Sequence, residues 1–131
     1  MGMTRKILLV DDEAGFTQLL RMNLEKGGRY EVCIENDSTK ALAAARAFHP
    51  DVILLDVVMP GMDGGDVQAA LQSDPRLAGI PVLMLTALVD STELSEGAVA
   101  QAGSQMVLPK PVNLALLFRV LDEILGETAP A

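Results

Sequence analysis

The sequence predicts an α/β fold in which a doubly wound, five-stranded parallel sheet is covered by five helices. Short apolar runs alternate with longer segments of helical periodicity, five times along the 131 residues. The apolar runs are mostly continuous, which is typical of parallel strands buried on both faces. The chain is long enough for one domain, and its 50% hydrophobic content is enough for one aliphatic core.

The expected strands are short, mostly apolar segments. Five strands joined by right-handed crossovers fit the flavodoxin-like order 2-1-3-4-5. In that order the winding reverses between the first and third strands, and ligands bind beyond the carboxyl ends of the strands at this switch point. The five segments are Ile7–Val10, Tyr30–Glu35, Val52–Leu55, Pro81–Leu85 and Met106–Leu108.

The expected helices are marked by apolar residues spaced three and four apart. Gly27-Gly28 provides a left-handed stop for the first helix, and Asn113 is suited to N-cap the last. The fourth is the weakest, because Gly97 costs about 1 kcal/mol relative to alanine in a helix. The apolar stripes run over Phe16–Leu24, Ala41–Phe48, Val67–Leu71, Leu94–Ala102 and Leu114–Leu125.

Composition and charge exclude several classes of protein. Eighteen acidic residues against 10 basic ones give a net charge of −8, which disfavours direct binding to nucleic acid or to an anionic membrane. No apolar run approaches the roughly 20 residues of a membrane span, and the N-terminus has no signal-peptide pattern. A single cysteine, Cys33, excludes an internal disulfide and fits a reducing compartment. We therefore expect a cytoplasmic protein.

Acidic residues follow two of the expected strands. The first strand runs into Asp11-Asp12-Glu13 and the third into Asp56. Taken singly, Asp11 or Asp12 could cap a helix and Asp56 could satisfy a turn. At the switch point, however, the three aspartates would repel one another, and a divalent cation would relieve that repulsion. Hard oxygen ligands of this kind favour Mg²⁺.

Two other strands place polar groups at the same edge. The fourth strand ends in Thr86-Ala87, and the fifth is followed by Lys110. Taken singly, a threonine or a lysine at the end of a strand is common and needs no functional explanation. Together with the aspartates they supply an oxygen nucleophile, metal ligands, a hydroxyl and a cation, which are the parts that phosphoryl transfer requires.

Four segments, in this order, resemble response-regulator receiver domains of bacterial two-component signalling. They are ILLVDDE at Ile7–Glu13, DVILLDVVMPGMDG at Asp51–Gly64, PVLMLTA at Pro81–Ala87 and LPKPV at Leu108–Val112. The resemblance covers residues 5–125. It leaves residues 1–4 as an N-terminal extension and residues 126–131 as a flexible tail.

The resemblance implies a role for each acid. Asp56 would be the phosphoacceptor, taking a phosphoryl group from a sensor histidine kinase or a phosphotransfer protein. Asp12, Asp56 and the backbone carbonyl of Val58 would bind Mg²⁺, and Asp11 would hold a water of that ion.

The resemblance also assigns the remaining groups of the pocket. Lys110 would pair with the phosphoryl oxygens, and Thr86 would swing to hydrogen-bond one of them. Ala87 would keep the pocket open and donate its amide. A cis peptide is expected at Lys110-Pro111, and the glycines that follow Met59 permit turns of positive φ.

This chain departs from the family pattern at Val107, where an aromatic ring usually accompanies the swing of Thr86. A β-branched valine has no comparable rotamer travel. We therefore expect activation to be transmitted through the backbone of the Leu94–Ala102 helix.

Two apolar positions flank the expected pocket. The resemblance implies that the side chains at these positions, Val58 and Leu88, influence how water reaches the acyl phosphate. Neither can orient a hydrolytic water, so slow self-dephosphorylation is expected. Leu116 and Val120 lie off the stripe of the last helix, and with Val107 they could form a contact patch on the helix4–strand5–helix5 face. By that face the family meets a downstream protein target or a tethered output domain, or forms a homodimer.

Rival functions remain open at this level. A haloacid-dehalogenase-type phosphatase would use Asp11 as its nucleophile, but it would carry a second aspartate where Glu13 stands. A flavodoxin-type flavin carrier would need a Ser/Thr-rich phosphate loop after the first strand. A receiver-like module that is not phosphorylated is the third alternative. The sequence favours a signalling switch that is no enzyme beyond self-phosphorylation from phosphodonors and slow self-dephosphorylation.

Overall fold

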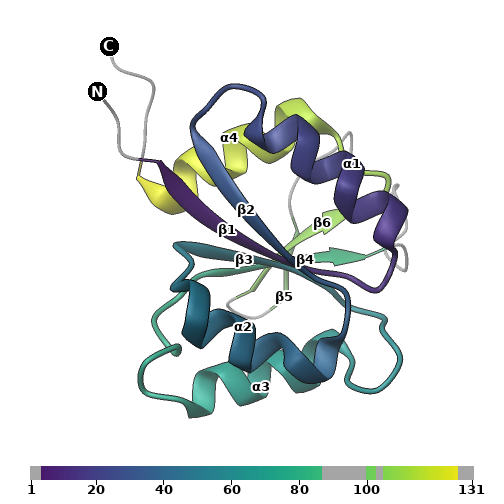
Figure 1. The fold of residues 1–131 in the computed structure, drawn as a ribbon, viewed down its shortest axis with the longest axis vertical. Helices are drawn as coiled ribbons and strands as arrows, with labels where there is room; N and C mark the ends of the chain where they lie inside the picture. Colours follow the sequence, from purple (N-terminus) through teal and green to yellow (C-terminus); the bar gives the residue numbers. More distant parts are fainter. Residues whose placement is uncertain (1–3, 87–99, 103–104, 127–131) are drawn as a thin grey trace.

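A computed structural model describes residues 4–86, 100–102 and 105–126 of the protein. One sheet runs through it in the order β2-β1-β3-β4-β6-β5 (Figure 1). Five of these strands pair in parallel, which confirms the predicted order 2-1-3-4-5. They are β1 (Arg5–Val10), β2 (Tyr30–Glu35), β3 (Val52–Asp56), β4 (Val82–Thr86) and β6 (Gln105–Pro109).

The sheet has one strand that the sequence analysis did not predict. β5 (Ala100–Ala102) pairs antiparallel with β6, with Ala100 opposite Val107 and Ala102 opposite Gln105. The prediction of a helix over Leu94–Ala102 is therefore wrong at its last three residues, and the rest of that segment lies outside the described residues. Periodicity cannot separate a short alanine-rich strand from a helix end, whereas pairing satisfies the backbone groups at the edge of β6.

Helices cover both faces of the sheet. α1 (Ala14–Glu25) and α4 (Leu114–Leu125) lie on one face, and α2 (Ala41–Phe48) and α3 (Gly64–Ser73) lie on the other (Figure 1). A short 3₁₀ turn, η1 (Ser38–Lys40), precedes α2. Successive strand residues point to opposite faces, so Ile7 and Leu9 pack under α1 and α4 while Leu8 and Val10 pack over α2 and α3. All four side chains are fully buried.

Two helix-end signals in the sequence are confirmed. The side chain of Asn113 caps α4 by accepting a hydrogen bond of 3.0 Å from the backbone N–H of Leu116. Gly28 has a φ of 76° shortly after α1, in the left-handed region that glycine adopts without steric cost.

Leu116 and Val120 do not form the exposed patch that was expected of them. They are 8% and 3% exposed and belong to the core with Leu117 and Leu121. The helix is therefore rotated so that a pair of adjacent positions on each turn faces the sheet. Leu114 and Leu125, which the stripe placed centrally, lie at the margin of the core. Several rotations suit a helix this apolar, and packing selects one of them.

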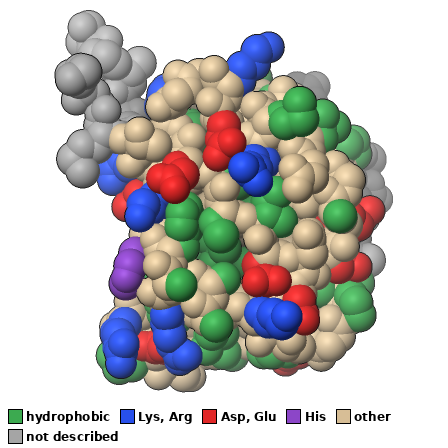
Figure 2. Space-filling model, viewed as in Figure 1, with side chains coloured by type: hydrophobic (Ala, Val, Ile, Leu, Met, Phe, Trp, Pro, Cys, Tyr) green, Lys and Arg blue, Asp and Glu red, His purple; other side chains and the backbone are tan. Residues whose placement is uncertain are grey.

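Charged side chains of both signs lie on the surface of the protein. On the face shown in Figure 2, basic side chains lie scattered among acidic and uncharged ones. Among the helices of the described residues, none is long and apolar enough to span a bilayer.

Candidate functional site

The sheet brings the predicted aspartates together. β1 and β3 are neighbours in parallel register, with Val10 opposite Leu55, so the residues that follow, Asp11 and Asp56, lie side by side. One carboxylate oxygen from each of Asp11, Asp12 and Asp56 lies within 4.8 Å of the others. Asp11 and Asp56 are 0% and 5% exposed, while Asp12 is open to solvent. The predicted convergence at the switch point is confirmed.

Backbone contacts hold the first of these acids in place. The carbonyl oxygen of Asp11 accepts a hydrogen bond of 2.7 Å from the side-chain amide of Asn36, and its Oδ1 accepts one of 2.9 Å from the N–H of Glu13. Glu13, not either aspartate, occupies the N-cap position of α1, and its side chain makes no capping hydrogen bond. The helix-capping alternative for Asp11 and Asp12 is therefore not what the structure has.

Lys110 completes the cluster from the end of β6. Its Nζ lies 2.7 Å from Asp11 Oδ2, 3.1 Å from Glu13 Oε1 and 3.6 Å from Asp56 Oδ2. The ammonium also lies 4.5 Å from the centre of the Phe16 ring. The backbone N–H of Lys110 donates to the carbonyl of Thr86, and the Lys110-Pro111 peptide bond is cis, as expected.

The electrostatics of the cluster are unbalanced. Burial raises the pKa of Asp56, the charge of Asp11 raises it further, and Lys110 only partly offsets them. Burial by itself would lower the pKa of Lys110, but contacts with Asp11 and Glu13 and the charge of Asp56 outweigh it, so that pKa is raised. A single ammonium thus faces several carboxylates, and the pocket keeps excess negative charge.

The donor set fits a divalent cation. Asp11 Oδ2 is buried and, among the described residues, accepts no hydrogen bond of ordinary geometry, although Lys110 Nζ is close. A buried carboxylate oxygen whose only close cation is the Lys110 ammonium, beside two further carboxylates, is among the described residues a suitable environment for Mg²⁺, which prefers oxygen ligands and keeps several waters. The residues that could hold the ion are Asp11, Asp12 and Asp56.

The loop after β3 approaches the cluster through its backbone. The N–H of Val58 donates to Asp56 Oδ1 at 3.4 Å, and the Val58 side chain is 56% exposed. A Cβ added at Gly64 would lie 2.6 Å from the carbonyl oxygen of Asp56, so only glycine fits there. Gly61 has a φ of 89°, as the expected glycine turn requires.

The proposed switch residues are only partly described. Thr86 is 3% exposed and pairs with Pro109 at the carboxyl end of β4. Val107 is half-buried and packs with the core between the sheet and α2 and α3. Ala87 and Leu88 lie outside the described residues.

Sequence reasoning missed the supporting residues. It gave no role to Glu13 or Phe16, although both lie at the start of the helix that follows the acids and contact Lys110. It also missed Asn36, whose amide bridges the Asp11 carbonyl and Thr17 Oγ1. Glu13 and Phe16 are three residues apart, a spacing that places side chains on one helix face and that could have indicated a shared partner.

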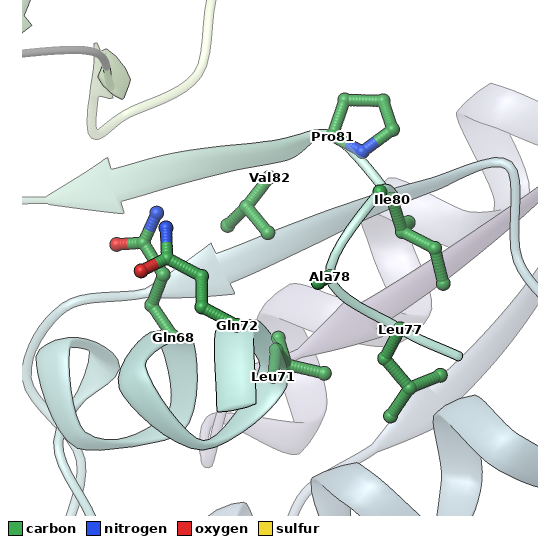
Figure 3. Close-up of a pocket in the computed structure, with 9 residues that line it drawn as sticks. Gln68, Leu71, Gln72, Leu77, Ala78, Ile80, Pro81 and Val82 are labelled. Carbon is green, nitrogen blue, oxygen red and sulfur yellow. The ribbon is translucent and has the colours of Figure 1, made fainter. Parts of the chain in front are cut away.

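A cavity elsewhere is separate from this cluster. It measures about 200 Å³ and lies between α3 and the segment that enters β4, at the opposite end of that strand from Thr86. Figure 3 shows the side chains of Gln68 and Gln72 next to each other, with Ile80 and Pro81 on the segment leading into Val82. The chemistry-bearing residues of the sequence analysis are not among its lining residues.

Comparison with known proteins gives a consistent result. The family model described as "Response regulator receiver domain" matches residues 7–122. The chain is 36% identical over 118 residues to the DNA-binding response regulator MtrA of Mycobacterium tuberculosis, covering 89% of this chain and 50% of MtrA. It thus spans about half the length of that relative.

Solved structures agree. The chemotaxis protein CheY4 of Vibrio cholerae matches with a TM-score of 0.76 and 33% identity, over 93% of this chain and 99% of CheY4. The receiver domain of the sensor histidine kinase PA1611 of Pseudomonas aeruginosa matches with a TM-score of 0.77 and 27% identity, over 95% of this chain and 100% of that one. In the PA1611 structure a magnesium ion is coordinated in the active-site cleft.

Proposed function

This chain belongs to the response regulator receiver domain family, and from that premise we propose that it is a signalling switch phosphorylated on Asp56. In this proposal a carboxylate oxygen of Asp56 attacks the phosphorus of a phosphohistidine on a sensor histidine kinase or a phosphotransfer protein. The P–N bond breaks, the imidazole leaves with the electron pair, and an acyl phosphate forms on Asp56.

The observation that carries the proposal is the position of Asp56. It is a nearly buried carboxylate, 3.6 Å from an ammonium and within 4.8 Å of two further carboxylates. A purely structural acid would have its charge matched locally, whereas this pocket has excess negative charge beside its cation. An incoming phosphoryl group bound with Mg²⁺ would balance the cluster.

Each neighbour has a role in the proposal. Asp11, Asp12, Asp56 and the backbone carbonyl of Val58 would bind Mg²⁺ or its waters, and the ion would neutralise charge on the phosphoryl oxygens. Lys110 would pair with one of those oxygens, and the Thr86 hydroxyl would donate to another. Ala87 would leave room for the group and donate its backbone amide.

The partners follow from the same proposal. A sensor kinase or phosphotransfer protein would supply the phosphoryl group in the cytoplasm. A downstream protein target or a tethered output domain would respond through the helix4–strand5–helix5 face, or the chain would form a homodimer by that face. In the described residues, strand 5 of this face is β6 and helix 5 is α4. Because Leu116 and Val120 are buried, other residues of α4 would make the contact.

Two properties would set this switch apart from others of its kind. With Val107 in place of an aromatic ring, the swing of Thr86 would be transmitted through the backbone of residues 94–102. Amide exchange in that segment that does not respond to phosphorylation would refute this. The apolar side chains of Val58 and Leu88 would leave the acyl phosphate with a lifetime of many minutes or longer, because neither orients a water.

The deciding experiment is incubation of the purified chain with acetyl phosphate and Mg²⁺, followed by intact and peptide mass spectrometry. We expect one phosphoryl group on the peptide that contains Asp56, and none on Asp56→Asn. A label on Asp11 would favour the phosphatase alternative. A folded chain that takes up no label would favour a receiver-like module that is not phosphorylated.

A further inference from the structure

The Lys110 ammonium lies closer to Asp11 and Glu13 than to Asp56. Asp11 Oδ2 and Glu13 Oε1 are 2.7 and 3.1 Å from its Nζ, within hydrogen-bonding distance, whereas Asp56 Oδ2 at 3.6 Å is beyond it. The Phe16 ring lies 4.5 Å away and offers a cation–π contact. Only 11% of the Lys110 side chain is exposed. The ammonium is therefore contacted by three groups other than Asp56.

We propose that Glu13 and Phe16 are positioning residues that hold Lys110 beside Asp11 and away from Asp56 until a phosphoryl group arrives. This proposal rests on the function proposed above. Glu13 is 64% exposed and its side chain does not cap α1, so helix formation does not account for its contact with Lys110. Phe16 is only partly buried at the margin of the core. The feature that both share is the ammonium.

The energetics give the direction of the effect. In the proposed step the ammonium leaves Glu13 and shifts away from the Phe16 ring in order to pair with a phosphoryl oxygen on Asp56. Contacts that exist only before the reaction stabilise the ground state and slow the chemical step. A partly exposed ion pair and a cation–π contact each correspond to a change of about 2- to 5-fold in rate.

The test measures the phosphorylation rate of the full chain by acetyl phosphate at saturating Mg²⁺, using intact mass. We expect Glu13→Gln and Phe16→Leu each to raise the rate about 2- to 5-fold. The matched control for Glu13→Gln is Glu31→Gln, which removes an exposed charge near the amino end of β2. The matched control for Phe16→Leu is Phe48→Leu, which removes the ring whose centre lies 5.1 Å from Lys6 Nζ. Neither control should change the rate.

A double-mutant cycle separates positioning from simple charge removal. Glu13→Gln also makes the pocket less repulsive to an anionic donor, whereas Phe16→Leu changes no charge. In a Lys110→Ala background both substitutions should lose their effect, because both act through that ammonium. In the unphosphorylated protein, the ¹⁵N signal of the Lys110 ammonium should shift in both variants and in neither control.

The outcomes are distinguishable. No labelling of the wild-type chain would overturn the proposed function itself. Labelled wild type with unchanged or slower variants would overturn the positioning role alone, as would a rate increase that persists without Lys110. Thermal unfolding of each variant confirms that the rates compare folded proteins, and Phe16→Leu keeps an apolar side chain at the margin of the core for that reason.

Discussion

Asp56 and Asp74 lie at opposite ends of the sheet, and their pKa values are displaced in opposite directions. Asp74 follows α3, where its carboxylate accepts a 2.9 Å hydrogen bond from the backbone N–H of Arg76 and another of 2.9 Å from the Arg46 guanidinium. These contacts hold its pKa below the ordinary value. Asp56 is buried beside Asp11, and its pKa is raised because burial and the charge of Asp11 outweigh the charge of Lys110, whose Nζ lies 3.6 Å away.

The two acids therefore differ in the effect that their ionisation has on the free energy of unfolding. The charge of Asp74 is matched where it stands, so ionisation favours the folded state. Ionisation of Asp56 opposes the folded state, and the surrounding core holds it in place. The following predictions test this contrast, beginning with the largest effect.

The largest effect is on chemistry. Asp56→Asn should reduce labelling by acetyl phosphate to background, because the amide is no nucleophile for phosphorus. Asp74→Asn removes a charge of the same sign at the opposite end of the sheet, and this variant should be labelled at the wild-type rate. Mass spectrometry of both variants after equal incubation checks this, and equal loss in the two would show that the ends are not functionally distinct.

The second effect is on the response to magnesium. At 100 times its Kd, a ligand that binds only the folded state stabilises it by about 2.7 kcal/mol. Wild type and Asp74→Asn should gain this stability with Mg²⁺ in thermal unfolding. Asp12→Asn, at an exposed position of the cluster, should gain much less. An undiminished gain in Asp12→Asn would place the ion elsewhere.

The third effect concerns the apolar side chain of Val58, two residues after Asp56. Val58→Asn would place a group able to orient water near the acyl phosphate and should speed loss of the phosphoryl group about fivefold, the equivalent of one hydrogen bond of about 1 kcal/mol. Met22→Asn alters an exposed apolar residue on α1 and is the control. The decay of isolated phosphoprotein, followed by mass, measures both. Rapid decay of wild type that Val58→Asn barely changes would contradict the expected slow hydrolysis.

The smallest effect is on stability without divalent ions. The raised pKa of Asp56 means that its ionisation costs stability as pH rises from the unfolded-state pKa through the folded one, so at neutral pH the full cost is present. Asp56→Asn should therefore raise the unfolding midpoint at neutral pH. The lowered pKa of Asp74 means that its contribution is present above the unfolded-state value and is lost as pH falls through the folded one, so Asp74→Asn should lower the midpoint.

Acidic pH should diminish both differences. The cost of Asp56 disappears as pH falls below the ordinary aspartate pKa of about 3.9, and the contribution of Asp74 is lost as pH falls from that value through its lowered folded-state pKa. Thermal unfolding at neutral and acidic pH, with a chelator present, measures the change. Shifts of the same sign in the two variants would refute the contrast between the two ends of the sheet.

Local patterns predicted most of the fold and the acids of the site. Most of the parallel strands contain a continuous apolar run, and the residue after such a run lies at the carboxyl edge of the sheet. Asp11 and Asp56 were therefore placed together before any contact was known. The cap at Asn113 is equally local, since it depends on residues one turn away.

Tertiary packing alone decided the remainder. The rotation of α4 buries Leu116 and Val120, because the sheet selects one face of a helix that is apolar over much of its surface. Residues 100–102 pair with β6 because an open strand edge is available there. The Lys110 ammonium lies nearer to Asp11 and Glu13 than to Asp56, and the distances differ by less than one ångström. Sequence spacing determines which groups reach one edge of the sheet, but such small differences arise only when all the side chains are packed together.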